Sequence, residues 1–130
     1  MELTDLLATM PFSQALGMTF LSADAAEVRA TLPWDECRTT LGGVLHGGAL
    51  MTLADSCGAV CAFLNLPEGA VGTSTIESKT NLFRGVRSGE VTASTTPLHA
   101  GRTTIAVQTE VRDGHGRLVS LTIQTQAVLS

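Results

Sequence analysis

Apolar and polar residues alternate along most of the second half of the chain. The clearest case is 105–112, where Ile105, Val107, Thr109 and Val111 take every second position. A period of two is typical of a strand that buries one face. The same period recurs over 16–23, 27–32, 76–82, 91–95 and 119–127, which predicts about six strands in all.

The strands are joined by short turn-forming sequences, Ser88-Gly89, Gly101 and 113–116. Such short connections favour antiparallel pairing. The alternation also assigns faces within two of the strands. One face of 76–82 carries Ile76, Ser78, Thr80 and Leu82, and the apolar positions of 119–127 are Val119, Leu121, Ile123 and Ala127.

Residues 47–64 instead repeat apolar residues every three to four positions, which predicts one long helix that Pro67 and Gly69 end. One face carries Leu50, Leu53, Ala54, Cys57, Val60, Cys61 and Leu64, and the other side carries Met51, Thr52, Asp55, Ala59, Ala62 and Phe63. Because neither side is charged like that of a surface helix, we expect burial almost all round.

A buried helix and several strands together predict an α+β domain in which an antiparallel sheet wraps around the helix. A second subunit or another element would cover the side that the sheet leaves open. The remaining segments are a short helix over 2–9, ended by Met10-Pro11, and a loop over 33–45.

Composition narrows the classes of protein. A chain of 130 residues predicts a single domain, 1–130, and 44% hydrophobic against 15% charged residues excludes a disordered chain. A net charge of −4 leaves no broad basic face for nucleic acid. The apolar stretch 43–66 contains Asp55, and a carboxylate at mid-bilayer costs about 2.5–3.5 kcal/mol. We therefore expect no membrane span.

The cysteines and the N-terminus indicate the compartment. Cys37, Cys57 and Cys61 are an odd number, unlike a secreted disulfide framework. No His or Cys pair has zinc-ligand spacing, so no metal site is predicted. Glu2 and Asp5 replace the basic start of a secretory signal. The expected location is the reducing cytoplasm.

Asp55 is the only charged residue between Arg38 and Glu68 and lies in the middle of the predicted helix. A carboxylate in such an apolar setting is costly unless it is paired or used. It is either a structural group that pairs with or caps a neighbouring loop, or a functional group, since such environments cluster at active sites.

The sequence His46-Gly47-Gly48 begins the same helix. Two glycines let a substrate approach the backbone closely. The first N–H groups of a helix have no partner within it and lie at the positive end of its dipole. They suit a carbonyl oxygen that gains charge during a reaction. The alternative is a plain junction between loop and helix.

His46 and Asp55 are nine residues apart, which is about 13 Å along a helix axis. This separation is too long for both to act on one carbonyl group within one chain. If they cooperate, two chains share the site, and their helices run antiparallel. The spacing then predicts an obligate dimer.

Residues 46–55, HGGALMTLAD, resemble the HGG-x(4)-LAD/LAE signature of hotdog-fold acyl-CoA thioesterases. A second stretch, PLHAGRTT at 97–104, followed by a strand, the turn DGHGRLV and a final strand, is similar to the same family. Within that family the chain looks like the PaaI-type phenylacetyl-CoA thioesterases and the aroyl-CoA thioesterases of the menaquinone and enterobactin pathways. The resemblance covers roughly residues 12–129 and implies a hotdog fold.

The resemblance implies roles for individual residues. Asp55 matches the catalytic carboxylate, which is a general base on water or a nucleophile. Gly47 matches the residue whose backbone N–H polarises the thioester carbonyl, and His46 matches a residue that orients the site near the sulfur. The substrate-binding residues that it implies are Gly48, Thr40, Thr75, Arg84, His99 and Arg102.

The resemblance also implies what some of these residues contact. Thr75 matches a strand Ser or Thr that positions water in some members, and Thr40 stands where many members carry Asn or Gln. For the phosphates of the coenzyme, arginine suits bidentate contact. The candidates are Arg84, Arg102 and His99, ahead of Lys79 and Arg87; the acyl group is expected against Leu41, Met51, Ala59, Ala62 and Phe63.

The chain is therefore expected to be a cytoplasmic thioesterase that converts a small or aromatic acyl-CoA to free acid and CoA. CoA is part of the substrate, so no cofactor is expected. The chain should form a homodimer, and a homotetramer as a pair of dimers, without a nucleic-acid or membrane partner. The alternatives are a hotdog acyl-CoA hydratase or dehydratase and a non-catalytic acyl-CoA-binding protein.

Overall fold

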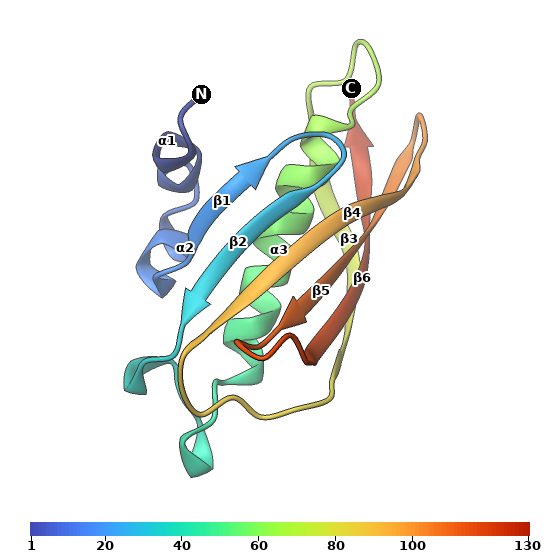
Figure 1. Cartoon of the computed structure of the whole chain (residues 1–130). Coiled ribbons are helices and arrows are strands. Elements are labelled where there is room, and N and C mark those ends of the chain that lie inside the picture. Colours follow the sequence, from blue (N-terminus) through green and yellow to red (C-terminus); the bar gives the residue numbers. More distant parts are fainter.

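A computed structural model, which describes all of residues 1–130, has one long helix enclosed by a curved antiparallel sheet (Figure 1). The helices are α1 (Leu3–Ala8), α2 (Pro11–Leu16) and α3 (Gly47–Leu64), and the strands are β1 (Thr19–Ala23), β2 (Val28–Pro33), β3 (Gly72–Leu82), β4 (Glu90–Ala100), β5 (Thr104–Arg112) and β6 (Leu118–Leu129). Two single turns of 3-10 helix, η1 (Glu36–Arg38) and η2 (Leu41–Gly43), interrupt the loop before α3. The predicted α+β architecture is confirmed.

The strands lie in the order β1-β2-β4-β5-β6-β3, and every neighbouring pair is antiparallel. After α3 the chain crosses to the far edge to form β3, and residues 83–89 then return it to the centre at β4 (Figure 1). β3 is therefore an edge strand of 11 residues that follows α3 directly in sequence. This connection places β3 beside the helix that carries Asp55.

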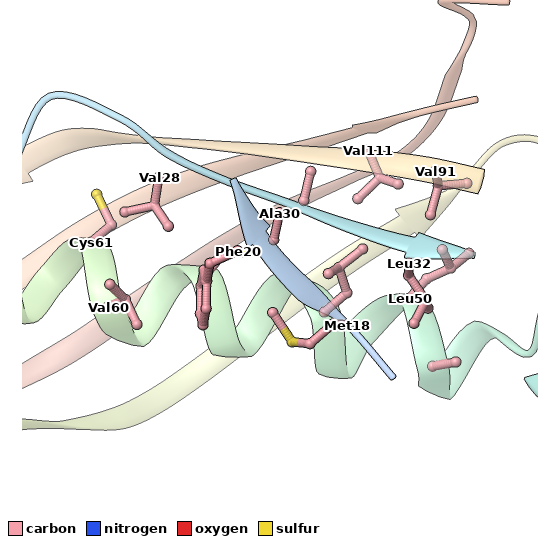
Figure 2. Close-up of a cluster of buried hydrophobic side chains, with 14 of the residues drawn as sticks. Met18, Phe20, Val28, Ala30, Leu32, Leu50, Val60, Cys61, Val91 and Val111 are labelled. Atoms are coloured by element: carbon pink, nitrogen blue, oxygen red, sulfur yellow. The ribbon is translucent and has the colours of Figure 1, made fainter. Parts of the chain in front are cut away.

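The core lies between α3 and the concave face of the sheet. Figure 2 shows Met18, which precedes β1, Phe20 of β1 and Leu32 of β2 in one cluster with the side chains of Leu50 and Val60 on α3. Leu53, in the middle of α3, is completely buried. α3 is long and apolar enough to cross a membrane, but 56% of it is buried inside the protein. It serves as the central helix of the core.

The face of β6 that meets α3 is polar, in contrast to what the alternation of apolar residues indicated. Of the four apolar positions in that strand only Val119 is buried, and Ile123 is exposed. The other side chains that β6 buries are Ser120, Thr122, Gln124 and Gln126. A row of buried hydroxyl and amide groups thus runs under α3 along the β3 side of the sheet.

β3 contains a bulge between Thr75 and Glu77. The extra residue, Ile76, shifts the alternation by one position. Thr75 therefore falls on the same face as Thr80, whose hydroxyl lies 2.7 Å from that of Thr122 on β6. Ile76 is 59% exposed, so the predicted face of this strand was wrong at that residue.

α2 was not predicted, because Met10-Pro11 was interpreted only as the end of the helix over 2–9. Pro11 occupies the first turn of α2, and Gly17 ends it in the left-handed conformation, with φ 97°. The guanidinium of Arg38 lies over Gly17 and donates to the carbonyl of Leu16. The α2–β1 corner is thereby attached to the loop that precedes α3.

Two of the three thiols are expected to resist alkylation in the folded protein. Cys57 and Cys61 are buried in the core, and burial raises the pKa of Cys57 to about 12 and that of Cys61 to about 11. Little thiolate is then present at pH 8. Cys37 is exposed, although a side-chain hydrogen bond to Asp35 raises its pKa.

Iodoacetamide should label one cysteine per native chain and three after unfolding in urea, as counted by intact mass. Labelling of Cys57 or Cys61 as fast as Cys37 under native conditions would contradict the packing described here.

Candidate active site

The carboxylate of Asp55 is held by hydrogen bonds on one of its two oxygens. Thr75 Oγ1 donates to Asp55 Oδ1 at 3.2 Å, and Gln124 Nε2 donates to the same oxygen at 3.1 Å. Thr75 Oγ1 in turn accepts from Gln126 Nε2 at 2.7 Å. Asp55 takes no part in either ion pair of the protein. Within one chain, Asp55 is therefore held by hydrogen bonds and not by an ion pair.

These contacts leave the second oxygen, Oδ2, without a protein donor. Asp55 lies on the exposed side of the helix. Three elements fix this arrangement. α3 carries Asp55, the bulge in β3 turns Thr75 toward it, and β6 carries the two glutamines. The result is an oriented carboxylate with one oxygen free to contact a ligand or water.

The other end of the site is the first turn of α3. His46 is the residue that caps the helix, and its Nδ1 accepts from the N–H of Gly48 at 2.8 Å. Nδ1 must then be unprotonated, so the neutral ring carries its proton on Nε2. The N–H of His46 donates to the carbonyl of Arg38 at 2.8 Å, which fixes the loop that leads into the helix.

Gly47 is left with the one free N–H of this turn. The N–H groups of Ala49 and Leu50 both donate to the carbonyl of His46, and that of Gly48 donates to the imidazole. No protein acceptor lies within reach of the Gly47 N–H. Since this donor also lies at the positive end of the helix dipole, it suits a carbonyl oxygen that gains negative charge.

Gly47 and Asp55 are fixed relative to each other by the helix between them. Eight residues of continuous α-helix separate them, or about 12 Å. Within one chain they cannot contact the same carbonyl carbon. One helix therefore presents a free donor at its first turn and an oriented carboxylate near its middle, too far apart to meet within one chain.

A cavity of about 690 Å³ opens one helical turn beyond Asp55. It lies between α1, the C-terminal half of α3 and the first residues of β3. Its lining is mostly apolar and consists of Met1, Leu3, Leu6, Thr9, Met10, Ala23, Ala59, Val60, Phe63, Leu64, Gly72 and Thr73. Of the residues expected against an acyl group, the cavity includes Ala59 and Phe63.

The other residues of that expected acyl set lie elsewhere. Leu41 is 95% exposed in η2, Ala62 is buried in the core, and Met51 lies exposed on α3 outside the cavity. Of the two phenylalanines near the N-terminus, Phe20 is part of the core and Phe12 is exposed.

The residues expected at the phosphates lie at two opposite ends of the sheet. Arg84 is in the 83–89 loop, beside the start of α3, where the N–H of Leu45 donates to the carbonyl of Val86. His99 and Arg102 are at the β4–β5 turn, at the other end (Figure 1). All three are exposed. One chain does not bring them together.

Thr40 and Gly48 differ in whether they keep a polar group free to bind a ligand. Thr40 is exposed in the loop before η2, and its hydroxyl has no hydrogen bond within the protein. The N–H of Gly48 is already used by His46. Of the two glycines of the motif, only Gly47 retains a free donor.

Sequence reasoning missed Gln124, Gln126 and Gly58. A Cβ on Gly58 would overlap the Gln124 side-chain amide, so glycine here is what lets that amide reach Asp55 across the helix. The available signal was the alternation of Gln124 and Gln126 in a strand next to Asp55 in the fold. Alternating polar residues are ordinarily interpreted as a solvent face, and here they are buried.

Comparison with known proteins adds an independent finding. The profile of the thioesterase superfamily matches residues 42–120, which include Gly47 and Asp55. The 1,4-dihydroxy-2-naphthoyl-CoA hydrolase of Escherichia coli is 36% identical over 78% of this chain and 74% of its own length.

Solved structures agree with this finding. A Haemophilus influenzae thioesterase is 30% identical, covers all of this chain and 92% of its own, and superposes with a TM-score of 0.91. A variant of the phenylacetic acid degradation protein PaaI from Thermus thermophilus has 28% identity and a TM-score of 0.83, over 92% of this chain and 97% of its own.

The cap of α3 can be tested separately from any chemistry. His46→Ala removes the acceptor of the Gly48 N–H and should lower the free energy of unfolding by about 0.5–2 kcal/mol. His46→Asn supplies another preferred capping side chain and should unfold close to the original protein. Urea denaturation at fixed protein concentration measures both, and equal losses in the two variants would exclude the capping role.

Proposed function

Since the chain belongs to the thioesterase superfamily and is a hydrolase acting on thioesters, we propose that it cleaves small or aromatic acyl-CoA esters at a site shared by two copies of itself. Its sheet and central helix form the hotdog fold. One observation carries the proposal: a free amide donor and an oriented carboxylate lie about 12 Å apart on one rigid helix.

The reaction divides between two half-sites, the Gly47 N–H and the Asp55 carboxylate. The thioester carbonyl oxygen accepts from the N–H of Gly47, which favours the negative charge that forms on it. Asp55 Oδ2 takes a proton from a water whose oxygen bonds to the carbonyl carbon. The C–S bond then breaks, and the sulfur leaves as the CoA thiol after receiving a proton. That proton is the one Asp55 took from water, so its transfer to the sulfur regenerates the carboxylate. The Nε2–H of His46 lies at the same helix end as Gly47 and suits a hydrogen bond to the leaving sulfur, without giving up its proton.

A second route uses the same residues. Asp55 Oδ2 attacks the carbonyl carbon, the thiol leaves, and water then hydrolyses the resulting mixed anhydride. Both routes yield the free acid and CoA and regenerate the carboxylate. Solvent oxygen found in Asp55 after a single turnover in labelled water identifies the second route with water attack at the Asp55 carbon, since the first route never labels Asp55.

A homodimer with antiparallel α3 helices is the arrangement that joins the half-sites. It places Gly47 of the partner subunit beside Asp55 and creates two equivalent sites. Two surfaces support such a contact. β3 has an unpaired outer edge, and the exposed side of α3 around Asp55 carries Met51 and Phe63. Pairing of two such dimers into a homotetramer stays a prediction.

The same arrangement accounts for the separated basic residues. An antiparallel dimer brings the α3 N-terminal end of one chain to the β4–β5 end of the other. Arg84 would then lie on the same side as Arg102 of the partner subunit. Arginine binds phosphate groups well, so this pair suits the phosphates of CoA without requiring a cofactor.

The apolar cavity supports a small or aromatic acyl group. At about 690 Å³ and with Ala59 one turn from Asp55, it is large enough for an aromatic ring and lies where a thioester at Asp55 would place its acyl carbon chain. Membership of the family gives the class of reaction, thioester hydrolysis. The size and apolar lining of the cavity support a small or aromatic acyl group.

Complementation between two inactive variants tests the shared site. Asp55→Asn should lower turnover of benzoyl-CoA by about 100- to 10,000-fold, because it removes the base. Gly47→Pro should lower it by about 100- to 1,000-fold, because proline lacks the N–H yet suits the first helical position. In a mixed dimer one site combines both defects and the other has neither. A 1:1 mixture, unfolded and refolded together, should recover about a quarter of the original activity.

Gly47→Ala is the matched control, because its Cβ meets Leu82 Cδ1 at 2.8 Å as the proline ring would, while the N–H is retained. It should lose far less activity than Gly47→Pro. Release of thiol from CoA esters, followed with a thiol-detecting dye, measures every variant. A mixture that stays inactive, or a fully active monomer, would overturn the shared site.

The cavity predicts selectivity for the acyl group. Ala59→Phe fills it and should lower kcat/KM for benzoyl-CoA by about tenfold or more relative to acetyl-CoA. Leu98→Phe, an exposed residue of β4 outside the cavity, is the control. If Ala59→Phe lowers both substrates equally, the acyl group binds elsewhere.

A further inference from the structure

We propose that Gln124 of β6 is the positioning residue that aims the Asp55 carboxylate at the thioester, an inference that rests on the proposed function. Gln124 Nε2 donates to Asp55 Oδ1 at 3.1 Å from a fully buried position. Gln126, also buried, acts one step further away, because it holds the hydroxyl of Thr75 that donates to the same oxygen. Both contacts come from one strand.

The burial of Gln124 has a cost that its structural surroundings do not offset. Its Oε1 is buried and has no hydrogen-bond partner. An unpaired buried acceptor destabilises a protein, whereas an apolar side chain of the same shape would not. The glutamine is therefore not the side chain that best stabilises this position. Its one side-chain hydrogen bond is to Asp55, and that bond indicates a role in the reaction.

The neighbouring helix, α3, leaves room for the same amide through a glycine. Gly58 lies three residues after Asp55 on α3, directly beneath the Gln124 side chain, and any Cβ there would displace the amide. Glycine in the interior of a helix is otherwise unfavourable. The fold thus holds two locally unfavourable residues, Gln124 and Gly58, and both serve the same hydrogen bond to Asp55.

The hydrogen bond matters because of the oxygen it selects. With Gln124 and Thr75 both on Oδ1, the Asp55 side chain cannot rotate without losing two donors, and Oδ2 stays free on the exposed side of α3. Gln124 acts through Asp55 and does not contact the substrate.

Gln124→Met tests this role while it keeps the volume of the side chain. We expect kcat to fall by roughly 10- to 100-fold, because the Asp55 carboxylate is no longer held in one orientation. KM should change by no more than about twofold, since no substrate contact is removed. Tm should stay equal or rise, because the unpaired acceptor is gone. A residue with a purely structural role would instead lower Tm and leave kcat of the folded protein unchanged.

A double-mutant cycle with Gly58 gives a second measurement. Gly58→Ala alone should lower kcat by a factor similar to that of Gln124→Ala, because it pushes the amide away from Asp55. In the Gln124→Ala background there is no amide to displace, so Gly58→Ala should have no further effect on kcat. Multiplied losses in the double variant would overturn the proposal.

Thr122→Val is the matched control. It breaks a buried side-chain hydrogen bond between β3 and β6, to Thr80, on the same strand as Gln124 but without contact to Asp55. It should leave kcat within about twofold. A loss as large as that of Gln124→Met would show that any defect in this strand pair impairs turnover, and would remove the special role of Gln124.

Two outcomes separate this inference from the proposed function. If Asp55→Asn retains turnover, the carboxylate mechanism fails, whatever Gln124 does. If Asp55→Asn is inactive but Gln124→Met keeps its kcat, the mechanism stands and only the positioning role is lost.

Discussion

The rigidity of α3 is the constraint on which the rest of the structure depends. Its 18 residues hold a free amide at one end and a carboxylate near the middle, and no side-chain motion can close about 12 Å of helix between them. A helix is thus well suited to present two reacting groups and unable to bring them together. In the proposed dimer, a second, antiparallel copy would supply each group where the first chain lacks it, so activity would depend on assembly.

The polar strip beneath α3 shows a conflict between stability and function. Elsewhere the sheet meets the helix mostly with apolar side chains, as at Val91 and Val107, and its buried threonines Thr95 and Thr109 pair with each other. Along β6 it presents hydroxyl and amide groups, and one amide oxygen there is unpaired. Such groups stabilise less than aliphatic side chains of similar size. Their concentration beside Asp55 is consistent with a core that gives up some stability to fix one carboxylate.

The sequence predicted those parts of the protein in which local signals and tertiary packing agree. The bounds of α3, 47–64, followed from its glycines, its apolar repeat and the proline beyond it. Asp55 and Gly47 stood out because a charge and a glycine pair are unusual in such a helix. Gln124 did not, because a polar residue in an alternating strand is normally exposed. The bulge at Ile76 was also invisible, since it depends on the pairing of β3 with β6.

The unpaired edge of β3 extends the same reasoning to folding. An edge of 11 residues with the exposed Ile76 and Val71 is a template for unwanted strand pairing. Pairing with a second copy of the chain would cover that edge and bring the two α3 helices together. The contact that protects the protein from aggregation would then be the contact that completes its sites. A chain that failed to dimerise would be both inactive and prone to aggregate, so selection on either property would preserve the other.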